Sequence, residues 1–292
     1  MQLQTANRKK AKMRLGIQGP SGSGKTMGAL KVAFGLCNDW SKIAVIDSEA
    51  ASSNLYAHLG HFNTVQLTAP LTPEKYIEAI QLCENSGMEV IIIDSGSHAW
   101  EYLLDYHASL PGNSFTNWRK VTPRHVAFIN AILQSKCHAI LTLRTKTDYV
   151  LTEKHGKQVP EKVGMKSIQR DGLDYELTVL LELDIKHNAI ASKDRTSLFA
   201  GKPEFKLTTG VGNALAAWCD HETSPGQEGE DETLTRIAAT ETIDELIGIY
   251  NQSKPEQQLQ FHERFVARRK VLQARANLIT QTVNTNKHVV RN

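Results

Sequence analysis

Eight consecutive residues near the N-terminus have the types and spacing of a loop that binds phosphate. Residues 19–26 read GPSGSGKT and match the pattern G-x-x-x-x-G-K-[ST]. The glycines would let successive backbone N–H groups curl around a β-phosphate at a helix N-terminus, where the helix dipole also favours an anion. Lys25 would reach the β- and γ-phosphates, and the Thr26 hydroxyl would bind Mg²⁺. The expected nucleotide contacts are Gly19, Pro20, Ser21, Gly22, Ser23, Gly24, Lys25, Thr26 and Met27.

The segments on both sides of this loop have the patterns that it needs. Residues 13–18 read as a short strand, and residues 27–36 are a run of good helix formers that ends near Asn38. Strand, loop and helix therefore follow one another in register. The alternative, a chance loop rich in glycine and serine, does not require these neighbours.

A later strand would bring a carboxylate to the phosphate loop. Residues 90–93 are four branched apolar residues, and Asp94 and Ser95 follow them. A P-loop protein presents its second metal-side carboxylate in this way, at the carboxyl end of a central strand. Asp94 is therefore the expected partner of Mg²⁺ beside Thr26, although a strand capped by Asp is common when it stands alone.

A P-loop protein that hydrolyses ATP also needs a carboxylate that polarises water in line with the γ-phosphate. Residues 42–46 form a buried-type strand that ends in Asp47, Ser48 and Glu49. Here the chain resembles the RecA recombinase core, in which a strand of this type carries the catalytic glutamate and a later strand ends in Asp. By that resemblance Glu49 is the general base. The alternative is a helix-capping or solvated acid.

Strands and helices alternate along most of the chain, which is typical of a parallel sheet covered on both faces. Further strands are expected at 64–67 and 137–144, and an amphipathic helix at 72–85. The apolar members of that helix are Tyr76, Ile77, Ile80 and Leu82. We therefore predict an α/β fold, with a RecA-like P-loop NTPase core of mostly parallel sheet flanked by helices over residues 13–220.

The strand predicted at 137–144 ends in polar residues that would sense the γ-phosphate in this fold. Thr142 and Arg144 are the candidates. The RecA family usually has a glutamine near this position, and this chain does not. The resemblance therefore leaves open how the nucleotide state would reach the next loop.

That next loop carries much of the positive charge of the chain. From Arg144 to Arg170 there are seven basic and three acidic residues, and glycine and proline should keep the segment mobile until a ligand orders it. In a RecA-like core a DNA-facing loop lies here, where phosphates supply a salt-sensitive attraction. The alternative is a solvated surface hairpin. The expected DNA contacts are Lys146, Lys154, Lys157, Lys162 and Lys166.

An earlier predicted loop, residues 111–123, combines an aromatic residue with neighbouring cations. It contains Phe115, Trp118, Arg119 and Lys120, of which Trp118 could stack on an unpaired base while the cations bind phosphate. The last three are the candidate DNA contacts. The alternative is a tryptophan that is tucked into the protein.

Two strands are expected at 175–183 and 188–192, and the second runs into Lys193, Asp194 and Arg195. This K-x-R resembles the pair that RecA-fold ring ATPases and recombinases insert into a neighbouring active site. Cations supplied by a neighbour would neutralise charge that develops on the γ-phosphate. The alternative is an ordinary basic turn. Together with residues 170–176, this stretch resembles phage-encoded RecA-like ATPases associated with single-strand annealing, a resemblance that covers about residues 12–219.

The ends of the chain differ in character from the core. We expect a basic N-terminal tail at 1–12, a polar linker at 221–233, a helical hairpin at 234–280 and a disordered tail at 281–292. The hairpin could bind DNA, a partner protein or the core, or expose a solvated basic face. Its apolar stripe is Phe261, Phe265, Leu272, Ala276 and Ile279. Its basic residues are Arg264, Arg268, Arg269, Lys270 and Arg275.

Composition excludes several classes of protein. The chain has 292 residues, 40% hydrophobic and 22% charged, with a net charge of +3. No apolar run approaches the ~20 residues of a membrane span, and no signal peptide is recognisable. The four cysteines are far apart and contain no C-x-x-C pair, which argues against a metal site or disulfide framework. We expect a soluble protein of the cytoplasm, that of a bacterial host if the chain is phage-encoded.

These features together predict an ATP-hydrolysing RecA-like protein that uses ATP and Mg²⁺. By the resemblance it acts on single-stranded DNA in phage-type homologous recombination, by annealing or strand exchange. It would assemble with itself as a ring or a filament, with a single-strand binding protein as a further partner and no membrane. A ring-forming DNA helicase or translocase is one alternative. The other is a nucleotide-switched partner-binding regulator that DNA does not stimulate.

Overall fold

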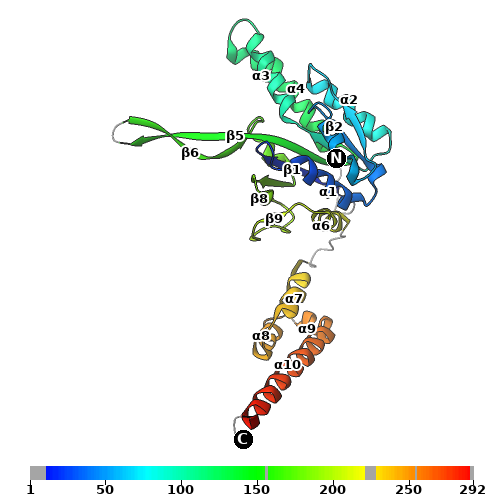
Figure 1. Ribbon diagram of the computed structural model, residues 1–292, viewed down its shortest axis with the longest axis vertical. Coiled ribbons are helices and arrows are strands. Elements are labelled where there is room, and N and C mark those ends of the chain that lie inside the picture. The colour runs from blue at the N-terminus through cyan, green and yellow to red at the C-terminus, as the bar shows by residue number, and fades with distance from the viewer. Residues whose placement is uncertain (1–10, 155–156, 221–227, 254, 290–292) are drawn as a thin grey trace. The chain divides into compact units, whose positions relative to one another are not determined.

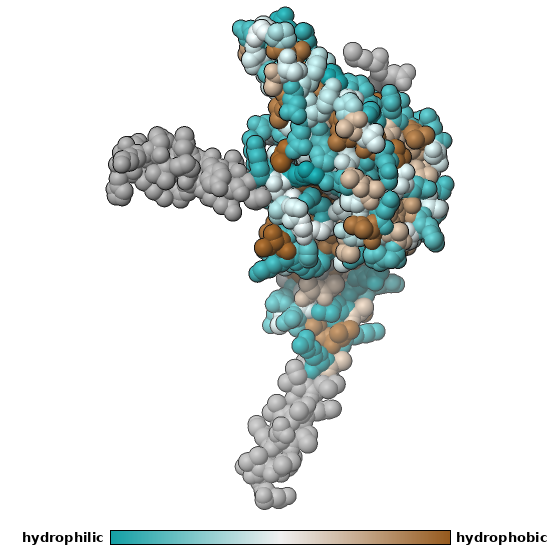
Figure 2. Space-filling model, turned by 45° about the horizontal axis from the view of Figure 1, so that its top comes forward, coloured by the Kyte–Doolittle hydropathy of each residue, from teal (hydrophilic) through white to brown (hydrophobic). Residues whose placement is uncertain are grey.

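The computed structural model describes residues 11–154, 157–220, 228–253 and 255–289. The chain divides into a sheet unit, Lys10–His221, and a helical unit that comprises Glu222–Asn292. The predicted core, 13–220, lies within the sheet unit. Across the described ranges, no helix is both long and apolar enough to cross a membrane. On the face drawn in Figure 2, apolar residues of the sheet unit lie in small groups among hydrophilic ones.

The sheet unit is built on one mixed sheet whose strand order is β3-β2-β4-β5-β1-β7-β8-β9, with β6 paired to β5 (Figure 1). The pairs from β3 to β7 are all parallel, while β8, β9 and β6 join antiparallel. This arrangement confirms the predicted α/β fold. The strands are β1 (Arg14–Gly19), β2 (Ile43–Asp47), β3 (Asn63–Gln66), β4 (Val90–Asp94), β5 (His138–Lys154), β6 (Lys157–Ser167), β7 (Val179–Leu183), β8 (Asn188–Asp194) and β9 (Phe205–Lys206).

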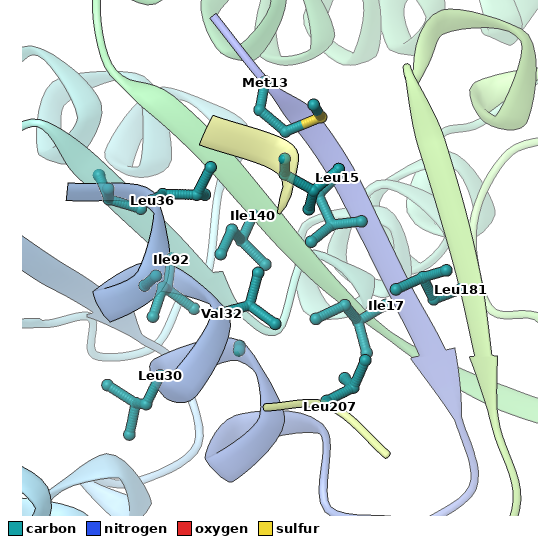
Figure 3. Packing of buried hydrophobic residues seen from close by; sticks show 14 of the residues in the cluster. Met13, Leu15, Ile17, Leu30, Val32, Leu36, Ile92, Ile140, Leu181 and Leu207 are labelled. Carbon is teal, nitrogen blue, oxygen red and sulfur yellow. The ribbon is translucent and has the colours of Figure 1, made fainter. Parts of the chain in front are cut away.

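The central strands are apolar on both faces because helices cover both faces. Every residue of β1, β2 and β4 is buried. Alternate residues of β4 divide between two hydrophobic clusters, with Val90 and Ile92 in one and Ile91 and Ile93 in the other. Figure 3 shows Ile92 in the first cluster, together with side chains of β1 and of the helix that follows the phosphate loop.

Helices α1 (Lys25–Cys37) and α6 (Thr209–Asp220) contribute to the first cluster. The second cluster takes side chains from α2 (Pro73–Asn85), α3 (Ser97–Ser109) and α4 (Ser114–Gln134). Three short helical segments complete the unit: η1 (Trp40–Lys42), η2 (Ser52–Leu59) and α5 (Leu173–Glu176).

Two glycines allow α1 and α6 to approach closely. A Cβ atom on Gly35 would lie 2.2 Å from the Thr209 carbonyl oxygen, and one on Gly212 would lie 2.2 Å from the Val32 carbonyl oxygen. Both neighbours are backbone atoms that cannot rotate away. The contact that holds the phosphate-loop helix against the C-terminal helix of the sheet unit therefore requires glycine on both sides.

Three local predictions were wrong. In α2 the side chain of Leu82 is 54% exposed, and the buried face instead includes Ala79 and Cys83. The predicted loop at 111–123 is mostly the start of α4, because the Asn113 side chain caps that helix and Pro123 is accommodated within it. Residues 173–176 form a helical turn, so the strand predicted from 175 begins only at Val179.

The predicted mobile loop at 144–170 is largely a two-stranded antiparallel hairpin. Strand β5 continues beyond the parallel sheet to Lys154, and β6 returns from Lys157 to Ser167 along it. Figure 1 shows this hairpin extending away from the sheet. Each strand supplies the backbone hydrogen-bond partners of the other, which overrides the glycine and proline of this segment. Pro160 stands opposite Leu151 within the pairing.

The helical unit has a small core of its own. Its helices are α7 (Glu228–Ala239), α8 (Ile243–Gln252), α9 (Pro255–Gln260) and α10 (His262–Val289). The core consists of Ile237, Leu246, Ile249, Phe261, Phe265 and Leu272, three of which belong to the predicted stripe. The side chains of Ala276 and Ile279 lie outside the described residues.

The helical unit also departs from the predicted boundaries. Helix α7 begins at Glu228, inside the segment expected to be a linker, and α10 continues to Val289, inside the segment expected to be disordered. The described part of this unit therefore has more helices than the two of the predicted hairpin. A capping box formed by Thr242 and Glu245 starts α8. Most of the predicted basic tail, 1–10, lies outside the described residues.

Candidate functional site

The phosphate loop joins the carboxyl end of β1 to the start of α1. Gly22 and Gly24 have φ angles of 78° and 85°, in the left-handed region that side chains disfavour. Between them, the Ser23 hydroxyl is buried and has no hydrogen-bond partner within the described part of the chain. An open loop of backbone N–H groups with an unpaired buried hydroxyl fits a ligand rich in acceptor oxygens.

Lys25 folds back over this loop. Its ammonium group donates hydrogen bonds to the carbonyl oxygens of Gly19 (2.9 Å) and Pro20 (2.8 Å). Burial lowers the pKa of Lys25, while the Asp94 carboxylate opposes that shift. The two neutral acceptors are weaker partners than phosphate oxygens, so the side chain is placed to exchange them for a bound nucleotide.

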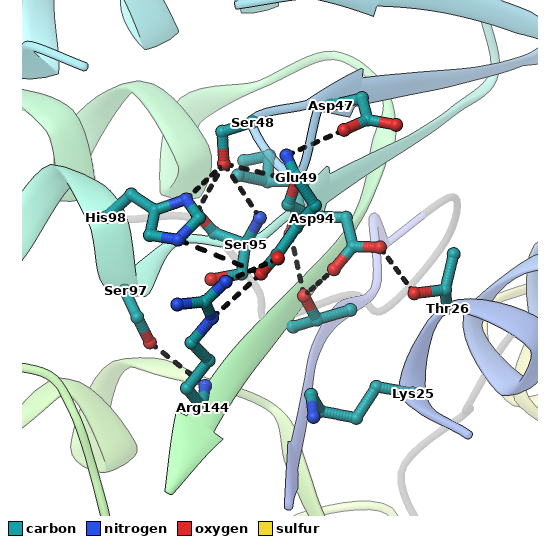
Figure 4. A network of polar contacts seen from close by, with 12 residues as sticks. Lys25, Thr26, Asp47, Ser48, Glu49, Asp94, Ser95, Ser97, His98 and Arg144 are labelled. Atoms are coloured by element: carbon teal, nitrogen blue, oxygen red, sulfur yellow. Dashed lines mark hydrogen bonds and ion pairs between the residues drawn. The ribbon is translucent and has the colours of Figure 1, made fainter. Parts of the chain in front are cut away.

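Asp94 joins the end of β4 to the phosphate-loop helix. Its Oδ2 atom accepts a hydrogen bond from Thr26 Oγ1 at 2.6 Å, and its Oδ1 atom accepts one from Thr142 Oγ1 at 2.5 Å (Figure 4). The carboxylate is 2% exposed, and burial raises its pKa while the two hydroxyl donors lower it. A carboxylate beside a threonine hydroxyl is the donor set that Mg²⁺ takes together with phosphate oxygens. Thr26 and Asp94 therefore fit the predicted metal role.

Glu49 follows β2 and faces the same region, where Arg144 binds it at two points. The Arg144 Nε atom lies 2.9 Å from Glu49 Oε1, and Nη2 contacts Oε2. This hydrogen bonding raises the pKa of Arg144. His98 Nε2 lies 3.9 Å from Glu49 Oε1. In this arrangement the guanidinium of Arg144 occupies both oxygens of the Glu49 carboxylate.

The turn that carries Glu49 is held by two side chains. The Asp47 carboxylate accepts hydrogen bonds from the Glu49 backbone (2.7 Å) and from both the backbone (2.9 Å) and hydroxyl (2.5 Å) of Ser53. Ser48 Oγ lies 2.8 Å from His98 Nδ1. No sequence motif indicated His98, because its role depends on α3 reaching the turn after β2.

Lys25, Thr26 and Glu49 line a cavity of about 830 Å³, a size typical of small-molecule sites. Besides the phosphate loop, Glu49, Asp94 and Arg144, it is lined by residues that sequence reasoning missed. The main ones are Lys31, Tyr56, His187, Lys206, Leu207 and Thr208. His187 contacts the phosphate loop itself, since a Cβ atom on Gly24 would lie 3.0 Å from His187 Nδ1. These residues follow no motif: Lys31 lies on α1 and Tyr56 in η2, while the others lie at the ends of the paired strands β7, β8 and β9.

A family model for the AAA domain matches residues 11–206, which is more than half of the chain. The chain belongs to the AAA domain family. It therefore carries a P-loop ATPase domain, in agreement with the phosphate loop and the parallel sheet. No curated protein matches the chain.

The predicted DNA contacts of the AAA domain lie in two places. Trp118 is half-buried, and its ring stacks on His107 (ring centroids 4.2 Å apart) and Trp100 (6.0 Å). Arg119 and Lys120 are exposed on α4.

The remaining predicted DNA contacts lie on the hairpin. Lys146 and Lys166 are exposed near its base, where Lys166 Nζ also lies 2.8 Å from Asp171 Oδ1. The side chains of Lys154, Lys157 and Lys162 lie outside the described residues.

Lys193 and Arg195 are far from the phosphate loop of their own AAA domain. Asp194, between them, pairs with Val179 at the start of β7, whereas the phosphate loop follows β1 beside the end of β7. The five residues of β7 span about 16 Å. Lys193 and Arg195 donate hydrogen bonds to the carbonyl oxygens of Asp174 and Tyr175. The fold therefore does not bring this pair to the cavity of the same chain.

Proposed function

We propose that this protein binds ATP with Mg²⁺ in the cavity around its phosphate loop and hydrolyses the γ-phosphate in response to single-stranded DNA. The role we propose is phage-type homologous recombination, by annealing or strand exchange. The observation that carries the ATPase part is the hydrogen bond from Thr26 to Asp94 in the cavity that also contains Lys25 and Glu49. These are the groups that bind phosphate, bind the metal and activate water.

Each of these residues has a separate task in the proposed reaction. Lys25 leaves the loop carbonyls and binds the β- and γ-phosphates. Thr26 and Asp94 hold Mg²⁺, which neutralises charge on the phosphate oxygens. Glu49 accepts a proton from the attacking water after Arg144 has released it. The γ-phosphate offers Arg144 a new anionic partner, because Arg144 lines the same cavity.

The proposed response to DNA rests on the β5–β6 hairpin. Residues 144–170 carry seven basic and three acidic residues, enough for a salt-sensitive attraction to a phosphate backbone. The hairpin pairing begins at Thr145, directly after Arg144, the residue that binds Glu49. Nucleic acid held along the hairpin could therefore influence the ion pair through a single residue. A single-strand binding protein is a further proposed partner.

Self-association into a ring or filament is part of the proposal. Lys193 and Arg195 lie away from the cavity of their own chain, so they could serve catalysis only in the cavity of a second copy. There the two cations would stabilise charge on the γ-phosphate. Turnover per subunit that is equal at very low and high protein concentration would contradict this pairing of subunits.

The proposal is tested by measuring the ATPase rate with and without single-stranded DNA at two salt concentrations, with Lys25→Ala as the blank. We expect DNA to stimulate turnover and the stimulation to fade as salt rises. Turnover that is indifferent to DNA would overturn the DNA part and favour the partner-binding regulator. Directional unwinding of a duplex, without annealing, would favour the helicase.

A further inference from the structure

The last 29 residues of the chain have an unusual charge pattern. From Arg264 to Asn292 there are seven Lys and Arg residues and no Asp or Glu. The whole chain has a net charge of only +3, so the rest of it is net negative. Solvated helix surfaces usually mix both signs, because pairs of opposite charge four residues apart stabilise a helix and like charges destabilise it. This segment lacks that compensation.

The described part of this segment lies in helix α10, whose apolar side packs into the core of the helical unit. Phe261, just before the helix, and Phe265 and Leu272 within it are buried in the core of the helical unit. The ring of Phe265 meets Tyr250 edge-on, with centroids 5.1 Å apart. The cations that this packing leaves exposed are Arg264, Arg269, Lys270 and Arg275. The helix is thus anchored on one side and presents positive charge on the others.

Among the described side chains of the helical unit, no acid is seen to pair with these cations. Glu245 is occupied by the backbone N–H groups of Glu241 and Thr242 in the capping box. Within the described residues, no ion pair joins an acid to Arg269, Lys270 or Arg275. Arg268 differs from these cations in having a structural task, because it donates to the Thr240 carbonyl oxygen after the end of α7. Within the part of the chain that the structure describes, the exposed cations make no comparable hydrogen bond.

We propose that the exposed cations of α10 bind the phosphate backbone of nucleic acid, as a second strand-binding surface besides the β5–β6 hairpin. Lys and Arg on a helix contact phosphates without reading sequence. No tryptophan, tyrosine or phenylalanine follows Phe265, so base stacking is not expected here. This proposal rests on the proposed function in one respect: two surfaces on two units would let one chain hold the two strands that annealing joins.

The test compares two triple variants of the full chain. One is Arg269→Gln/Lys270→Gln/Arg275→Gln. The control is Lys12→Gln/Lys136→Gln/Lys202→Gln, which removes the same charge from exposed positions of the sheet unit. Binding of a labelled single-stranded oligonucleotide is measured over a series of salt concentrations. For the α10 variant we expect the slope of log K against log salt to fall by about 2, since each lost phosphate contact contributes about 0.7. For the control we expect no change.

Three further readouts make the test decisive. Circular dichroism should show unchanged helicity in the α10 variant, and Arg269→Lys/Arg275→Lys should keep the parental slope. An unchanged slope in the α10 variant, or an equal loss in the control, would overturn the proposal. A change of oligomeric state in sedimentation, with the DNA slope unchanged, would assign α10 to self-association instead.

The outcome is separable from the proposed function. A slope that falls in the α10 variant while DNA leaves ATP turnover unchanged would support this surface and contradict the DNA-stimulated ATPase. If DNA stimulates turnover but the slope is unchanged in the α10 variant, the DNA-stimulated ATPase would be supported and the α10 surface contradicted.

Discussion

Arg144 binds Glu49 at two points although the two residues lie 95 positions apart in the chain. Arg144 is also the last residue of β5 that pairs with β1, and the next residue, Thr145, already pairs with Ser167 of the hairpin. One side chain therefore joins the candidate general base to the root of the candidate DNA-binding hairpin. Under the proposed mechanism, this ion pair must open before Glu49 can contact the attacking water.

Glu49→Gln should abolish most ATP turnover while nucleotide binding persists. Glutamine has the same shape but cannot take a proton from water, and loss of a general base typically costs 10²–10⁴-fold in rate. Single-turnover hydrolysis and binding of a fluorescent ATP analogue separate the two effects. Glu78→Gln on the exposed side of α2 is the control. Turnover that survives in the Glu49 variant would remove this residue from the mechanism.

Arg144→Lys should uncouple DNA binding from ATP turnover. Lysine keeps the charge but cannot form the two-point contact that a guanidinium makes with a carboxylate. We expect the ratio of turnover with DNA to turnover without it to fall toward one, at unchanged oligonucleotide affinity. Lys146→Arg, two residues further along β5, is a matched control. Full stimulation in Arg144→Lys would show that the ion pair does not carry the signal.

The ion pair between Glu74 and Arg124 should make stability depend on pH in the acid range. Two hydrogen bonds of 2.7 Å from Arg124, which also lies over the Tyr102 and Tyr106 rings, lower the pKa of Glu74 to about 2. A depressed folded-state pKa contributes stability that is present above the unfolded value of about 4.5 and lost as pH falls toward about 2.

Glu74→Gln should therefore unfold at a lower temperature than the parent at neutral pH, and the difference should shrink through that acid window. The effect is modest because the carboxylate is half-exposed. Thermal melting at a series of pH values measures it. A difference that stays constant with pH would show that the loss comes from packing rather than from the charge pair.

Gly35→Ala should destabilise the sheet unit by about 3 kcal/mol, the upper range for overpacking. The added Cβ would lie 2.2 Å from the Thr209 carbonyl oxygen, so α1 and α6 would have to separate. Gly210→Ala is the control within α6, since its nearest neighbour would be the Thr208 hydroxyl at 3.5 Å. Urea unfolding compares the two. Equal stability of both variants would contradict the close helix contact.

Local patterns in the sequence determined the chemistry of the phosphate loop and the class of the fold. The glycines at 22 and 24 are needed by their own backbone angles, and the apolar run before Asp94 is buried on both faces of the sheet. Such features depend on a few neighbouring residues, so they are readable in order along the chain. The predicted strands around 13–18, 42–46 and 90–94 match β1, β2 and β4 closely for that reason.

Only the tertiary structure decided which distant side chains meet. The pairing of Asp94 with Thr142, and of Glu49 with Arg144, follows from placing β5 between β4 and β1, and no local pattern encodes a strand order. The same holds for the remote position of Lys193, which depends on β8 running antiparallel to β7. The stretch after Arg144 had the composition of a loop, but a paired partner strand satisfies its backbone hydrogen bonds and makes it a hairpin. The type of a residue determines which chemistry its side chain can perform. Long-range strand pairing determines which other side chains it meets.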